Sequence, residues 1–64
     1  MLTMDQVYNA YVELCAALGE EVIPIAQLYT KFPGTPAGDL LPAMNDLIRA
    51  GDLRLAPGSC IRTG

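Results

Sequence analysis

The chain has 64 residues, of which 52% are hydrophobic and 17% charged, and it carries seven carboxylates, four Lys or Arg and no histidine. This composition is typical of a single small globular domain spanning residues 1–64. Without histidine, a metal-ligand cluster or a phosphate-binding glycine loop, we expect no enzyme, no catalytic or metal site and no cofactor. A domain of this size buries only about 60% of its unfolded surface, so we also expect it to associate with itself or with a partner.

Charge is unevenly distributed along the chain. The formal net charge is −3, and residues 1–22 contain four carboxylates but no Lys or Arg. Residues 23–64 hold all four basic residues among three carboxylates, which is far from a strongly basic nucleic-acid surface. No apolar run approaches the roughly 18 residues of a membrane span, and residues 1–5 lack the basic start of a signal peptide. We therefore expect a cytoplasmic protein.

The two cysteines, Cys15 and Cys60, are not spaced as a CxxC pair and have no histidine to complete a metal site. A buried cysteine packs as a small hydrophobic residue. We therefore expect two buried free thiols in preference to a disulfide.

A first helix begins after Thr3, because Thr3 and Gln6 have the spacing of a capping box, in which each side chain satisfies a backbone N–H of the other residue. Gly19 supplies the left-handed residue that ends such a helix. One face of the helix carries a stripe of apolar side chains that we expect in the core: Met4, Val7, Tyr11, Leu14 and Leu18.

Tyr8 and Val12 fall on the flank of this helix, beside the core stripe. They have two interpretations that the sequence does not separate. They either fill the edge of the core, or they form part of a dimer interface that a small domain would gain from.

The next segment combines a strand signal with a helix signal. Val22 and Ile23 are β-branched and favour a short strand, and Pro24 is suited to the first position of a helix. This second helix is expected to end at Pro33-Gly34. Its buried face is predicted from apolar residues at helical spacing: Ile25, Leu28, Tyr29 and Phe32.

A third helix ends at Gly51, and its start has two candidates. Thr35-Pro36 resembles a helix start, but a helix from there would hold Pro42 in its interior at a cost of about 3 kcal/mol. We therefore predict a helix from Asp39 to Ala50, with a short helix at residues 36–38 as the alternative. Its apolar face is Leu40, Leu41, Met44, Leu47 and Ile48, and its outward positions are Asp39, Pro42, Ala43, Asn45, Asp46 and Arg49.

After Gly51 the apolar residues alternate with polar ones, as in Leu53-Arg54-Leu55, which is the period of a strand. Pro57-Gly58 then turns the chain back. A loop with an odd number of residues would place Leu53, Leu55 and Ile61 on one face, whereas a two-residue loop would set Arg54 beside Ile61. We predict the first arrangement, because it keeps the apolar residues together.

The order of helix, short strand, helix, turn, helix and hairpin resembles the winged-helix (winged helix-turn-helix) superfamily. The stretch from Leu47 to Leu55 is similar to the segment in which that family's third helix ends in glycine and enters the wing. The resemblance implies a mainly α fold with a small antiparallel sheet (α+β), with three helices, a two-stranded C-terminal wing and a short strand at Val22-Ile23.

The resemblance also implies that the third helix approaches the major groove of double-stranded DNA while the wing contacts its backbone. The expected DNA-binding residues are then Lys31, Asn45, Arg49, Arg54 and Arg62. We expect a small, non-catalytic DNA-associated regulator that binds as a homodimer. Asp39 and Asp46 would repel phosphates, however, and with Pro42 they suit the alternative of a winged-helix protein–protein interaction module or an accessory subunit that does not bind DNA.

Overall fold

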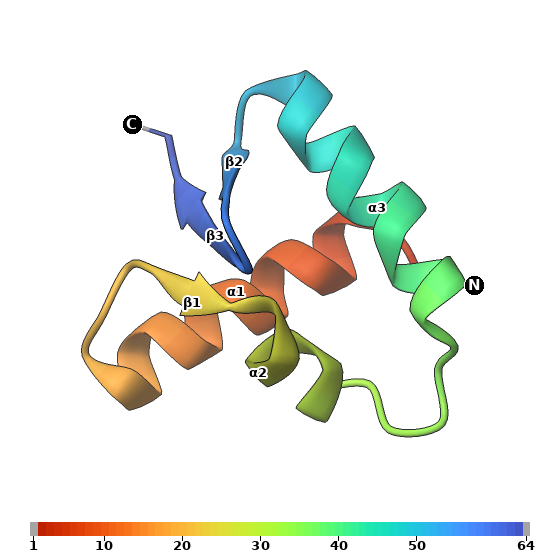
Figure 1. Ribbon diagram of the computed structural model, residues 1–64, viewed down its shortest axis with the longest axis horizontal. Helices are drawn as coiled ribbons and strands as arrows, with labels where there is room; N and C mark the ends of the chain where they lie inside the picture. Colours follow the sequence, from red (N-terminus) through yellow and green to blue (C-terminus); the bar gives the residue numbers. More distant parts are fainter. Residues whose placement is uncertain (1, 64) are drawn as a thin grey trace.

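The computed structural model describes residues 2–63, except for the side chain of Ala37 (Figure 1). Three helices and a three-stranded antiparallel sheet make it a mixed α+β fold, in the strand order β1-β3-β2. No helix among the described residues is long and apolar enough to cross a membrane. The elements in chain order are α1 (Met4–Leu18), β1 (Ile23–Pro24), α2 (Ile25–Thr30), α3 (Ala37–Ala50), β2 (Leu53–Ala56) and β3 (Ser59–Arg62).

Helix α1 has the predicted ends. The Thr3 N–H donates to Gln6 Oε1 over 3.0 Å, and the Gln6 N–H donates to Thr3 Oγ1 over 3.2 Å, which completes the capping box. Gly19 ends the helix at a φ of 68°, with its N–H donating to the Cys15 carbonyl. The predicted core stripe is wrong at Leu18, which is 46% exposed because it lies in the last turn, outside the core cluster.

Strand β1 and helix α2 are each displaced from their predicted bounds. The strand is Ile23–Pro24, one residue later than predicted, because Ile23 is the residue that pairs with Cys60 of β3. Helix α2 ends at Thr30, before Pro33-Gly34, because the Lys31 N–H donates to the Leu28 carbonyl in a tight last turn. Leu28 is buried as predicted.

Helix α3 begins at Ala37, so the predicted start at Asp39 is wrong. Pro36 is the N-cap residue, and its carbonyl accepts the Asp39 N–H over 2.9 Å. Pro42 consequently lies inside the helix, where it removes the hydrogen bond to the carbonyl of Gly38. Gly38 is exposed, so water can satisfy that carbonyl.

Two residues of α3 face the opposite way from the prediction. Ala43 was assigned to the outward face but is only 3% exposed, and Leu41 was assigned to the core but is 54% exposed. The buried line of the helix is Leu40, Ala43, Met44 and Leu47. Leu41 lies outside this line on the helix surface and is therefore left toward solvent.

The hairpin has a two-residue loop, so the predicted odd loop is wrong. Arg54 pairs with Ile61 and Leu55 with Cys60, which leaves Pro57-Gly58 as the turn. Gly58 has a φ of 71°, as expected for glycine after proline in a type II turn. The prediction took Ile61 as the inward residue of the returning strand. The core instead buries Cys60, which is fully inaccessible, and this fixes the register.

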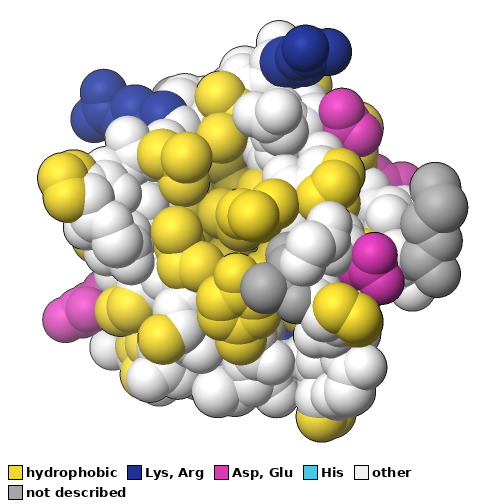
Figure 2. Space-filling model, turned by 45° about the vertical axis from the view of Figure 1, so that its right-hand side comes forward, with side chains coloured by type: hydrophobic (Ala, Val, Ile, Leu, Met, Phe, Trp, Pro, Cys, Tyr) yellow, Lys and Arg dark blue, Asp and Glu magenta, His cyan; other side chains and the backbone are white. Residues whose placement is uncertain are grey.

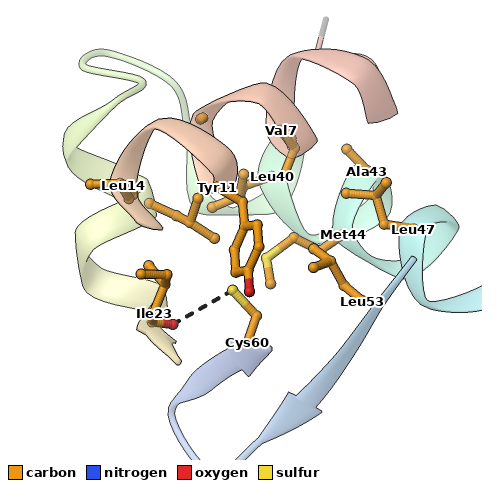
Figure 3. Packing of buried hydrophobic residues seen from close by; sticks show 12 residues of the cluster. Val7, Tyr11, Leu14, Ile23, Leu40, Ala43, Met44, Leu47, Leu53 and Cys60 are labelled. Carbon is orange, nitrogen blue, oxygen red and sulfur yellow. Dashed lines mark hydrogen bonds between the residues drawn. The ribbon is translucent and has the colours of Figure 1, made fainter. Parts of the chain in front are cut away.

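The core lies where the three helices meet the sheet (Figure 3). Tyr11 is fully buried and points toward Cys60, whose Sγ donates to the Ile23 carbonyl over 3.5 Å. The Tyr11 hydroxyl donates to the Glu21 carbonyl over 2.5 Å and accepts the Arg62 N–H over 2.8 Å. One buried side chain thus ties α1 to β3 and to the segment that leads into β1.

Candidate functional site

An open, mostly apolar groove lies between α3, β2 and the start of α2, and we refer to it as the α3–β2 groove. Its volume is about 460 Å³, within the range of ligand-binding pockets. None of its lining residues is charged, and Asn45 has the only polar side chain among them. The lining residues are Ile25, Gly38, Leu41, Pro42, Met44, Asn45, Ile48 and Leu55.

Two large apolar side chains project into solvent at this groove. Leu41 on α3 is 54% exposed, and Leu55 on β2 is 56% exposed. Leu41 and Ile48 are seven residues apart and therefore lie on the same flank of α3. Figure 2 shows apolar side chains across the centre of one face of the molecule, with Lys and Arg side chains only at its margin in this view. Exposed apolar patches of this kind mark interaction sites.

The groove exists because α3 and β2 diverge from the turn at Gly51, as Figure 1 shows. Gly51 adopts a φ of 82°, and the Asp52 N–H donates to the Leu47 carbonyl, so the chain leaves the helix at a fixed angle. Leu53 is then buried against the core, and Leu55, two residues further from the junction, is left uncovered.

The residues expected to bind DNA do not form one cluster. Lys31 is paired with Glu13 of α1, with its Nζ 3.0 Å from the carboxylate Oε2. Asn45 is exposed in the groove, and its side chain has no hydrogen bond to any described residue. Arg49 and Arg54 are exposed and take part in no ion pair within residues 2–63.

Arg62 lies against Tyr11, in a hollow at the end of α1. Its Cζ is 5.8 Å from the centre of the Tyr11 ring, which is a cation–π distance. Its Nε is buried and has no hydrogen-bond partner among the described residues. The shallow hollow beside it is also lined by Glu20 and Glu21, which would repel a phosphate.

The two residues expected at a dimer interface are placed differently from each other. Tyr8 is half-buried and packs on the core, with its ring centre 6.2 Å from that of Tyr11. Val12 is 38% exposed and lines the hollow that contains Arg62. Tyr8 therefore fills the edge of the core, and the dimer interface stays a prediction.

The residues expected for a protein partner form one stripe. Asp39, Pro42 and Asp46 are exposed on α3 with the spacing i, i+3, i+7. Neither aspartate takes part in an ion pair within the described part of the chain. Pro42 also lines the groove, so the acidic stripe borders the apolar surface directly.

Both cysteines are free thiols, as predicted, but Cys15 is only partly buried, so the prediction that both are buried is wrong at Cys15. Cys60 is fully buried, and burial raises its pKa to about 11, so it is unreactive near neutral pH. Cys15 is half-buried beside Arg62 in the hollow at the end of α1. Within residues 2–63, no group of His, Cys, Asp or Glu side chains could hold a metal ion.

No family model, curated protein or solved structure matches the chain. Inferences about its function therefore depend on the residues and their arrangement. The sequence prediction missed the groove because it placed Leu41 and Leu55 on buried faces. The available signal was the excess of apolar residues in α3, since five large ones exceed what a single buried stripe accommodates.

Proposed function

We propose that this chain is a winged-helix domain that acts as a non-catalytic protein–protein interaction module. The element order and the pairing of β1 with β3 support the winged-helix assignment. In it, α3 corresponds to the recognition helix and the β2–β3 hairpin to the wing. The surface between them is the one that would meet DNA in that family.

The observation that carries the proposal is the chemistry of this surface. The α3–β2 groove is apolar and lacks charged lining residues, whereas binding to DNA depends on neutralising phosphates. Only Arg49 and Arg54 are exposed and unpaired among the described basic residues. Two phosphate contacts would give a salt slope of only about −1.8, on a chain whose net charge is −3.

The same surface fits a protein segment with apolar side chains. The segment would cover three apolar side chains that line the groove: Leu41, Ile48 and Leu55. Removing apolar surface from water favours binding. Asp39 and Asp46 lie next to these contacts and would pair with Lys or Arg on the partner. The negative net charge favours encounter with such a partner over encounter with DNA.

The test is a selection of short random peptides displayed on phage, using the wild-type chain as bait. The enriched peptides are then synthesised and titrated against wild type, Leu41→Glu and the matched surface control Arg54→Ala. We expect Leu41→Glu to weaken binding by at least about tenfold and Arg54→Ala to leave it nearly unchanged. Leu41 is more than half exposed, so this variant should keep its fold, as circular dichroism would show.

A parallel titration with duplex DNA addresses the other hypothesis. At about 50 mM salt, electrostatic binding to DNA is strong. If wild type binds duplex DNA there, if Arg54→Ala weakens that binding, and if no peptide depends on Leu41, the chain is a DNA-binding protein and the proposal is wrong.

A further inference from the structure

We infer that the protein segment in the α3–β2 groove binds in an extended conformation and adds a fourth strand to the sheet, along the free edge of β2. This inference rests on the proposed function and specifies the conformation of the partner. It follows from the hydrogen-bond pattern of β2.

Strand β2 has a neighbour on one side only. The sheet order β1-β3-β2 makes it an edge strand. The Thr63 N–H donates to the Asp52 carbonyl over 3.3 Å, which makes these two residues a hydrogen-bonded pair. Pairs alternate along an antiparallel ladder, so Arg54 and Ile61 form the next hydrogen-bonded pair. The backbone groups of Leu55, which lies opposite Cys60, therefore point away from β3.

The backbone groups of β3 that point away from β2 have hydrogen-bond partners within the domain. Cys60 is paired with Ile23 of β1, and the outward N–H of Arg62 donates to the Tyr11 hydroxyl. On the β2 side, the N–H and carbonyl of Leu55 have no such partner among residues 2–63. Leu55 is more than half exposed, β2 contains no proline, and its one charged side chain, Arg54, lies on the opposite face of the sheet from Leu55.

Leu55 brings this edge strand to the groove, and the groove decides which side chains an added strand would carry. The Leu55 side chain lines the groove together with Leu41 and Ile48, while its free backbone groups lie in the plane of the sheet, so a strand added beside β2 would place alternate side chains on the face that Leu55 shares with the groove. Alternate residues of an added strand would point toward α3, and the others toward solvent. The segment therefore has apolar residues at every second position, over about the four residues that β2 offers.

A bound helix would leave the N–H and carbonyl of Leu55 bonded to water, whereas an added strand would form a hydrogen bond with each of them. Main-chain hydrogen bonds then supply affinity and the groove supplies selectivity. Asp39 and Asp46 are exposed on α3 and the net charge is −3, which favours a partner with Lys or Arg over a second copy of this chain. The partner is thus an extended segment of another protein that has apolar residues at every second position.

The experiment uses an enriched peptide made in two N-methylated series. One series methylates the odd residues and the other the even residues, and each removes backbone N–H donors from one edge of the peptide only. We expect one series to bind at least about tenfold more weakly than the other, because only one set of N–H groups faces β2.

A protein variant tests the same contact from the other side. Leu55→Pro removes the outward N–H without removing a bond to β3, and it should weaken binding about tenfold, whereas Leu55→Val should retain most of it. Thermal melts of both variants check the fold, and the methylated peptides report on the contact even if Leu55→Pro does not fold.

The outcomes separate the inference from the proposed function. Strand addition is wrong if both methylated series bind equally, or if the apolar residues of the enriched peptides have the 3.6-residue period of a helix. In either case, peptide binding that depends on Leu41 would still support an interaction module. If no peptide depends on Leu41, the proposed function itself fails. If wild type dimerises without peptide and Leu41→Glu makes it monomeric, the occupant is a second copy and the inference is overturned.

Discussion

Replacement of Tyr11 by phenylalanine tests the central contact of the fold. The ring is fully buried, and its hydroxyl joins the Glu21 carbonyl to the Arg62 N–H. Phenylalanine would keep the ring packing but leave both backbone groups without their partner. An unsatisfied buried polar group costs about 1–3 kcal/mol, and both groups here are partly accessible to water.

We therefore expect Tyr11→Phe to lower the free energy of unfolding by about 2 kcal/mol. For a domain of this size, that corresponds to a fall in Tm of roughly 8–15 °C. Urea denaturation should show a lower midpoint with an unchanged slope. Tyr8→Phe is the matched control, because the Tyr8 hydroxyl has no hydrogen bond to a described residue. If the two variants have the same midpoint, Tyr11 contributes only its ring and the reasoning is wrong.

Four further predictions concern the helix end, the two thiols and self-association. Gly51→Val should destabilise the fold by at least about 1–2 kcal/mol, since Gly51 has a φ of 82° and the space around it is open; a melt that matches wild type would contradict this. The raised pKa of Cys60 stabilises the folded state fully below pH 9, and this stability should be lost as the pH rises to about 11, measured by denaturation of wild type against Cys60→Ala. Iodoacetamide at pH 8 should modify Cys15 in the folded chain and Cys60 only after unfolding, as mass spectrometry would show. Changing Tyr8 and Val12 to lysine should produce a monomer with full helical content if they form a dimer interface, and an unchanged sedimentation profile would count against that interface.

The sequence by itself determined the features that depend on neighbouring residues. The start of α1 follows from Thr3 and Gln6, which bond to each other within one turn. The ends of α1 and α3 follow from Gly19 and Gly51, because a left-handed residue after a helix is a local requirement that glycine meets best. The mixed α+β composition could also be predicted, since the change of period after Gly51 is visible in the sequence alone.

Only the tertiary structure decided which faces those elements bury. The hairpin register depends on the burial of Cys60, and the face that α3 buries depends on the packing of Leu40, Ala43, Met44 and Leu47 in the core cluster. Pro42 is tolerated inside α3, since the carbonyl that it leaves without a helical hydrogen bond belongs to an exposed residue, Gly38. The pairing of Lys31 with Glu13 and the groove beside Leu55 join residues far apart in the chain. Local sequence fixes backbone conformation at short range, whereas burial is decided by contacts between elements, which no single segment specifies.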